Sequence, residues 1–81
     1  MFPDSPPCVL KVQVERITYY NEEDHYTIAK VKIDGRNSLV TAVGTLYSVV
    51  PGELLRIEGD WTVHPRYGEQ FRITSYETLL P

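Results

Sequence analysis

The sequence predicts an all-β fold, a small closed barrel of five strands, and three observations support this. Five runs of alternating apolar and polar residues are separated by short segments rich in polar residues, Gly or Pro. The chain has 81 residues, of which 42% are hydrophobic and 23% charged, enough for one small folded domain. The first run is long and changes phase once, as a strand that bends around a barrel does.

The first strand is expected over residues 9–20, at the start of a single domain that covers residues 9–81. A polar, proline-rich lead-in over residues 1–8 precedes it and is expected to be flexible. The apolar phase that includes Val12 slips near Glu15, and a slip by one residue predicts a bulge.

The second strand is expected over residues 26–33, with its core-facing positions at Ala29, Val31 and Ile33. The tetrapeptide at residues 34–37, Asp-Gly-Arg-Asn, is a turn signal between two alternating runs. The third strand, residues 38–44, should therefore form a hairpin with the second.

The rest of the chain supplies two more strands, residues 54–63 and 70–77. Residues 46–50 are too few for a regular helix, and Pro51-Gly52 marks a turn, so the connection before the fourth strand should be short. Gly59 is suited to a bend in the fourth strand. Five strands with a long first one match the Greek-key barrel called the OB-fold, and a five-stranded SH3-like barrel is the alternative.

Residues 61–71, which run from the end of the fourth strand through the following loop into the fifth, combine aromatic and basic residues. Pro65 lacks a backbone donor and Gly68 permits a positive φ, so we expect a compact loop that does not simply extend the strand ladder. Trp61 has the phase of the apolar residues before it, which favours a core position over a stacking platform.

Several classes of function find no support in the sequence. Cys8 is the single cysteine and has no nearby histidine, and His25 and His64 are too isolated for metal-ligand spacing. None of the glycines belongs to a G-x-x-x-x-G-K-[ST] phosphate loop. We expect no catalysis, cofactor or metal in this chain, no membrane partner, and a reducing, cytoplasmic compartment.

The net charge of −3 argues against a strong sequence-independent grip on phosphates. Three of the 11 acidic residues, Glu22, Glu23 and Asp24, share one expected loop, which leaves eight acidic against eight basic residues elsewhere. A local basic face is compatible with that balance. The acidic loop is either a solvated tip or a contact for a basic partner.

Cations and aromatic rings occur together in a pattern suited to single-stranded DNA, whose bases stack and whose phosphates attract cations. The predicted nucleic-acid-binding residues are Tyr26, Lys30, Lys32, His64, Arg66, Tyr67 and Arg72, with Gln70 beside them. The usual OB-fold binding surface is strands two and three with the loops after strands one and four, so it would include those of these residues that lie on the second strand and in the last loop. The structural alternative is that Tyr67 packs on a neighbour, that the arginines pair with Asp60 or Glu69, and that the lysines only solubilise the second strand.

Three segments resemble the N-terminal domain of the RecD-like ATP-dependent DNA helicases, bacterial proteins related to the exodeoxyribonuclease V alpha subunit. They are residues 10–23, 26–29 and 59–72, and the most specific part is W-x-x-H-P-x-Y-G-x-Q-F, which begins at Trp61. The resemblance extends from about residue 10 to residue 81. Val12 and the pair Asp24-His25 depart from it, since relatives often have glycine at the first position and Asn-Gly at the second.

The resemblance implies an OB-fold accessory domain of an enzyme that unwinds DNA with 5'-to-3' polarity in repair or recombination. ATP and magnesium would then bind elsewhere in the parent protein. Three functions follow as expectations: handling of single-stranded DNA, a docking module that contacts the remaining domains of the helicase or another repair protein without binding DNA, or a structural spacer if neither face binds anything. A continuous positive path from Lys30 to Arg66 would favour the first.

Overall fold

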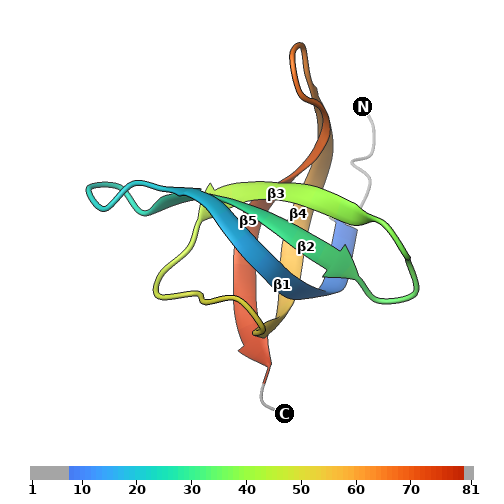
Figure 1. Cartoon of the computed structure of the whole chain (residues 1–81), viewed down its shortest axis with the longest axis horizontal. Helices are drawn as coiled ribbons and strands as arrows, with labels where there is room; N and C mark the ends of the chain where they lie inside the picture. Colours follow the sequence, from blue (N-terminus) through green and yellow to red (C-terminus); the bar gives the residue numbers. More distant parts are fainter. Residues whose placement is uncertain (1–7, 80–81) are drawn as a thin grey trace, which may run out of the picture.

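The computed structural model describes residues 8–79, which form strands and the turns that join them (Figure 1). The strands are β1 (Cys8–Tyr20), β2 (Tyr26–Ile33), β3 (Leu39–Thr45), β4 (Leu54–His64) and β5 (Gly68–Leu79). They close into a barrel in the order β1-β2-β3-β5-β4, with β3 and β5 parallel and the other pairs antiparallel. The predicted five-stranded barrel is confirmed. Residues 1–7 of the expected lead-in lie outside the described part of the chain.

β1 is long because it belongs to two sides of the barrel. Residues 8–13 pair with β4, and residues 12–20 pair with β2. The register with β2 shifts next to Glu15, which confirms the predicted bulge, and shifts again next to Thr18, which the sequence pattern did not reveal. The Thr18 hydroxyl donates to the carbonyl of Ile28 at 3.0 Å and so fills the second irregularity. These bulges let one strand curve around the barrel.

Apolar side chains from every strand fill the barrel. The core comprises Val12, Val14, Ala29, Val31, Ile33, Ala42, Leu46, Leu55, Ile57, Phe71 and Ile73. The inward positions predicted for β2 are therefore confirmed. Trp61 packs against this core while remaining partly exposed, with its ring edge-on to Phe71 and the centroids 5.1 Å apart. It lies at the margin of the core instead of inside it.

Gly59 is the point at which β4 bends. The register between β4 and β5 shifts between Glu58 and Gly59, and Gly59 is buried. A Cβ atom at this position would lie 1.8 Å from the carbonyl oxygen of Arg72. Only glycine lets the two backbones come this close. The bend that the sequence predicted is thus confirmed and has a steric cause.

The expectation that the compact loop between the last two strands does not extend the strand ladder is wrong. β4 and β5 stay paired to the end, with His64 opposite Gly68, and only residues 65–67 form the turn. Pro65 occupies a turn position, where its missing N–H removes no ladder hydrogen bond. Gly68 has φ 83°, the left-handed conformation that ends a three-residue hairpin loop. The two residues interpreted as ladder breakers are therefore the residues that form a tight hairpin.

The connection between β3 and β4 is short, as predicted. Leu46 is buried in the core, and the backbone N–H of Tyr47 donates to the Tyr76 hydroxyl at 2.8 Å, which fixes the connection to β5. Gly52 completes the turn after Pro51 with φ 95°. Within residues 8–79 no helix has the length and apolar character required to cross a membrane.

Candidate nucleic-acid interface

The outer side of β2 carries three of the predicted site residues. Side chains alternate along a strand, so Tyr26, Lys30 and Lys32 point away from the core-facing positions between them. Val43 on β3 lies opposite the outer side of β2 and also opposite Arg72 on β5. Arg72 is therefore on the same surface, about 10 Å from β2. We call this surface, the outer side of β2, β3 and β5, the sheet face.

Two cations of the sheet face already have protein partners. The Lys30 ammonium donates to the Thr41 hydroxyl at 2.6 Å, and the Arg72 guanidinium pairs with Asp60 at 2.7 Å. The structural alternative predicted for Arg72 is thus confirmed. Both side chains of that ion pair are more than half exposed, and exposed pairs contribute only about 0–1 kcal/mol. A phosphate could replace Asp60 at little cost, and Lys32 is exposed.

The sheet face also presents aromatic and apolar surface. Tyr26 is 39% exposed and lies edge-on to Tyr19, with ring centroids 6.4 Å apart at 60°. Leu39, opposite Lys32 on β3, is 46% exposed. A nucleic-acid base can stack on such rings while cations bind the adjacent phosphates.

The other three predicted residues lie at the tip of the β4–β5 hairpin, which stands off the top of the barrel in Figure 1. We call residues 60–72 the hairpin arm. Nδ1 of His64 accepts hydrogen bonds from the backbone N–H groups of Arg66, at 3.0 Å, and Tyr67, at 3.3 Å. His64 therefore shapes the turn. Its ring also lies 4.7 Å from that of Tyr67, which stays 69% exposed.

Arg66 projects from the turn without a carboxylate partner. The ion pairs within residues 8–79 are Arg56–Glu77 and Arg72–Asp60, so the predicted pairing of Arg66 with Glu69 is not formed in this part of the chain. Arg66 and Tyr67 together offer a free cation and an exposed ring. A cation and a stacking ring are the two kinds of group that proteins combine to bind single-stranded DNA.

The structure divides the seven predicted residues into two groups. Tyr26, Lys30, Lys32 and Arg72 share the sheet face, whereas His64, Arg66 and Tyr67 occupy the tip of the arm. β5 runs parallel to β3 from Gln70 opposite Thr41, so the arm extends past the start of β3. Gln70 lies between the two groups but is only 9% exposed, which removes it as a contact.

Sequence reasoning missed Arg36, in the turn between β2 and β3. Its guanidinium carbon lies 5.7 Å from the centre of the Trp61 ring, a cation–π distance. This contact joins the turn to the base of the hairpin arm. The turn signal at residues 34–37 could place Arg36 on the surface, but its partner depends on the closure of the barrel.

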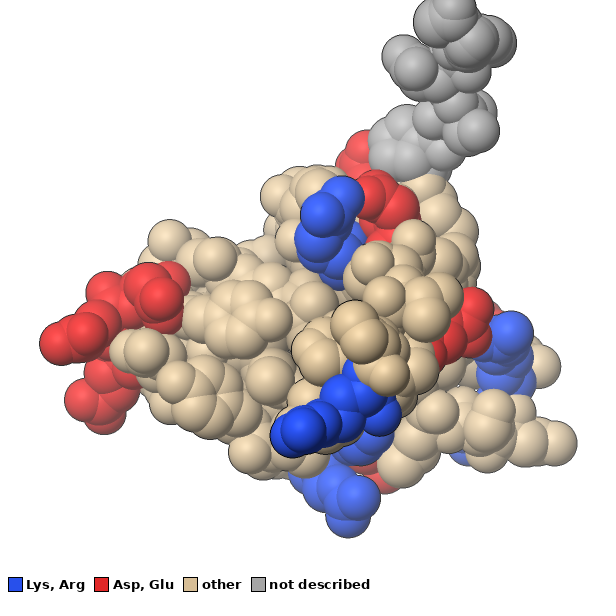
Figure 2. Space-filling view, turned by 90° about the horizontal axis from the view of Figure 1, so that it is seen from above, with Lys and Arg blue, Asp and Glu red and all other residues tan. Residues whose placement is uncertain are grey.

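Three of the acidic residues lie together at the tip of the loop between β1 and β2. Figure 2 shows red side chains at the end of the molecule where Figure 1 places this loop. The loop contains Glu22, Glu23 and Asp24, all exposed. On this face the blue side chains lie over the wider part of the molecule as separate groups. On the face shown in Figure 2, positive charge therefore reaches the surface as separate patches.

The same loop contains one of the departures from the helicase resemblance. His25 adopts φ 61°, the left-handed region that glycine occupies at least cost. The Tyr20 hydroxyl lies 2.6 Å from Nδ1 of His25, and the ring of Tyr47 lies 4.5 Å away. The backbone N–H of Leu46 donates to the His25 carbonyl at 3.1 Å. These contacts hold His25 in a conformation that its side chain does not favour.

The closed five-stranded barrel with this strand order is an OB-fold. Its β2–β3 side and its β4–β5 hairpin carry cations and tyrosines, the residue types of a nucleic-acid interface. A family model described as "ATP-dependent DNA helicase YrrC, OB-fold domain" matches residues 8–81, and the chain belongs to that family. Searches of the curated proteins and of the solved structures found no match.

The part of the chain that the structure describes, residues 8–79, holds no residues arranged as a magnesium–ATP site. Gly35, Gly52 and Gly68 serve β-turns, and none belongs to a phosphate loop that leads into a helix. No group of three His, Cys, Asp or Glu side chains within residues 8–79 could hold a metal ion. No step of ATP hydrolysis is assigned to this domain.

Proposed function

We propose that this chain is an accessory domain that guides single-stranded DNA in an ATP-dependent 5'-to-3' DNA helicase of repair or recombination. The parent protein would be cytoplasmic and would bind ATP and magnesium outside this domain. The observation that carries the proposal is the shared sheet face, which unites Tyr26, Lys30 and Lys32 with Arg72 from a strand 40 residues later in the chain. Family membership makes DNA the first ligand to test.

The chemistry of the two groups is complementary. Tyr67 and Tyr26 are exposed rings on which bases can stack, and each stacked base contributes roughly 1–3 kcal/mol. Arg66 and Lys32 would neutralise phosphates, and Arg72 would exchange Asp60 for a phosphate oxygen. Because the cations form patches on an acidic chain, binding should be weak and strongly dependent on salt.

The first prediction concerns the double variant Arg66→Ala/Tyr67→Ala. Loss of one stacking ring should weaken binding of a labelled oligo-dT by roughly 5- to 150-fold, since 1–3 kcal/mol corresponds to that range. Loss of one phosphate contact should also lower the slope of log affinity against log salt by about 0.7. Fluorescence anisotropy at low and moderate salt measures both quantities.

The matched control is Arg56→Ala/Tyr47→Ala, which removes one arginine and one exposed tyrosine outside the sheet face and the arm. Its affinity should stay within about two-fold of wild type. Equal losses in the two double variants would assign the effect to net charge alone. Absence of binding by the wild type at low salt would overturn autonomous DNA binding by the domain.

One observation favours a second function, docking on a protein. The acidic tip of residues 22–24 stands off the barrel beside exposed rings of Tyr19, Tyr20 and Tyr47. Acidic side chains next to exposed aromatic surface suit a basic partner. The partner would be the helicase body or another repair protein.

The second prediction separates these functions with the variant Glu22→Gln/Glu23→Gln. Neither carboxylate has a hydrogen-bond or ion-pair partner within residues 8–79, so the loop should keep its shape. If the sheet face binds DNA, loss of two repelling charges should tighten oligo-dT binding about two- to five-fold. If the tip docks on protein, affinity for the parent helicase deleted for this domain should fall several-fold by calorimetry, with DNA binding unchanged.

A further inference from the structure

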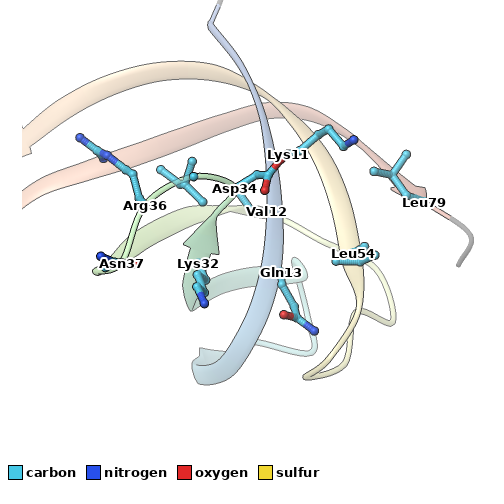
Figure 3. Close-up of a pocket in the computed structure, with 11 residues that line it drawn as sticks. Lys11, Val12, Gln13, Lys32, Asp34, Arg36, Asn37, Leu54 and Leu79 are labelled. Carbon is cyan, nitrogen blue, oxygen red and sulfur yellow. The ribbon is translucent and has the colours of Figure 1, made fainter.

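A hollow of about 540 Å³ opens at the end of the barrel where the turn between β2 and β3 meets the start of β1 (Figure 3). Its polar lining comes from Lys11, Gln13, Lys32, Asp34, Arg36 and Asn37. Leu54 and Leu79, the paired ends of β4 and β5, add apolar surface. The volume is within the range of sites that bind small molecules or parts of larger ligands. Except for Lys32, none of these residues belongs to the predicted site.

The hollow is basic, although the whole chain is acidic. Lys11, Lys32 and Arg36 are exposed cations, and Asp34 is the single carboxylate of the lining. Within residues 8–79 none of the three cations forms an ion pair. Concentrated positive charge in a concave surface attracts anions more strongly than the same charges on a flat one.

The fold fixes the backbone from which these side chains extend. The backbone N–H of Asp34 donates to the carbonyl of Lys11 at 2.9 Å, which attaches the turn to β1. The N–H of Arg36 donates to the carbonyl of Ile33 at 2.9 Å and closes the turn, with Gly35 at φ 88°. The site is therefore built on hydrogen-bonded backbone.

The arrangement of the cations indicates the shape of the anion. Figure 3 shows Lys11, Lys32 and Arg36 extending in different directions around the hollow and not converging on one point. A single phosphate would satisfy one of them. An extended polyanion that crosses the hollow would meet several in turn, as the backbone of a nucleic-acid strand does.

The hollow is also continuous with the proposed DNA surface. Lys32 belongs both to the sheet face and to the lining. Arg36 lines the hollow and lies over Trp61 at the base of the hairpin arm. An acidic peptide shares the charge of DNA, but this continuity favours the strand that would already lie on the sheet face.

We propose that the hollow binds the phosphate backbone of single-stranded DNA and extends the DNA path around the turn between β2 and β3. Lys11, Lys32 and Arg36 contact successive phosphates, and Leu54 with Leu79 gives a base an apolar surface. This inference rests on the proposed function, because it lengthens the same path.

The test uses the 81-residue chain with Lys11→Gln/Arg36→Gln, which leaves the shared Lys32 in place. In oligo-dT titrations at several salt concentrations, the slope of log affinity against log salt should fall by about 1.4, about 0.7 for each lost phosphate contact. Arg56→Gln, which removes a charge on β4 outside the lining, should leave the slope within about 0.2 of wild type. Arg36→Lys should keep most of the slope, because it keeps the charge.

Asp34→Asn supplies a gain-of-affinity test. Asn-Gly is as good a turn former as Asp-Gly, so the turn should persist without its carboxylate. Oligo-dT binding should tighten about two- to five-fold. Amide NMR spectra should also show the signals of Gly35 and Asn37 shifting on addition of oligo-dT.

The outcomes separate the two proposals. If Lys11→Gln/Arg36→Gln leaves the salt slope unchanged while Arg66→Ala/Tyr67→Ala still weakens oligo-dT binding, the hollow does not bind DNA. The proposed function then stands without it. No binding by the wild type overturns both. Thymidine monophosphate and inorganic phosphate are compared with oligo-dT at equal phosphate concentration. If either shifts the Gly35 and Asn37 signals as strongly as oligo-dT does, the hollow binds a single phosphate, and the proposed DNA path through it is wrong. Tighter binding of oligoglutamate than of oligo-dT assigns the hollow to acidic peptides and also overturns it.

Discussion

Replacement of Gly59 by alanine should destabilise the domain by at least about 3 kcal/mol. The added Cβ would lie 1.8 Å from the carbonyl oxygen of Arg72, so β4 and β5 would have to separate at the bend. A domain of 81 residues has a total stability of about 4–12 kcal/mol, of which this is a large share. The melting temperature should fall by roughly 12–24 °C in a thermal unfolding experiment followed by circular dichroism.

The control for this prediction is Gly68→Ala at the tip of the same hairpin. Gly68 has φ 83°, but no atom lies within 4 Å of the position that a Cβ would take, so alanine there costs only the left-handed backbone, about 1–2 kcal/mol. The two variants compare a steric clash with a conformational cost. Equal melting temperatures would show that β5 moves away from Gly59 without penalty, and the steric cause of the bend would be wrong.

Local patterns were sufficient to predict the strands. Alternation is a property of neighbouring residues, and the inward set Ala29, Val31 and Ile33 follows from it directly. Gly59 was recognisable because a glycine within an alternating run often marks a bend or a close approach of two backbones. The hairpin at residues 65–67 was misjudged because Pro and Gly both interrupt ladders and form turns, and only the pairing of His64 with Gly68 decides between these roles.

The candidate site was less accessible to sequence reasoning because it depends on contacts between distant residues. Alternation along β2 is sufficient to predict that Lys30 and Lys32 share a face. Their proximity to Arg72 could not be predicted in this way, because it depends on the parallel pairing of β3 with β5. The partner of Arg72, Asp60, could be named as a candidate but not chosen over Glu69. Lys11 and Arg36 are 25 residues apart in the chain, and no local pattern connects them to one hollow.

The hairpin arm connects the core of the barrel to the proposed DNA path. Trp61 contacts Phe71 inside the barrel and Arg36 at the edge of the basic hollow. Arg66 and Tyr67 extend from the same two strands. The orientation of the arm therefore depends on how firmly its base is packed.

Phe71→Ala should test that dependence and should be the most destabilising core truncation. Phe71 is fully buried, and truncation of a buried phenylalanine costs about 3–5 kcal/mol through lost burial and the cavity left behind. The edge-on contact with Trp61 is lost as well. We expect the melting temperature to fall by roughly 12–40 °C, and the fluorescence of Trp61, the single tryptophan, to shift to longer wavelength before global unfolding.

Phe71→Leu keeps most of the volume and should cost less than about 1.5 kcal/mol. If the arm is oriented by its base, Phe71→Ala should also weaken oligo-dT binding at temperatures where circular dichroism shows the barrel folded, and Phe71→Leu should not. If folded Phe71→Ala keeps wild-type affinity, packing against the core does not orient the arm. The strand pairing within the arm, from Asp60 opposite Arg72 to His64 opposite Gly68, would then be sufficient.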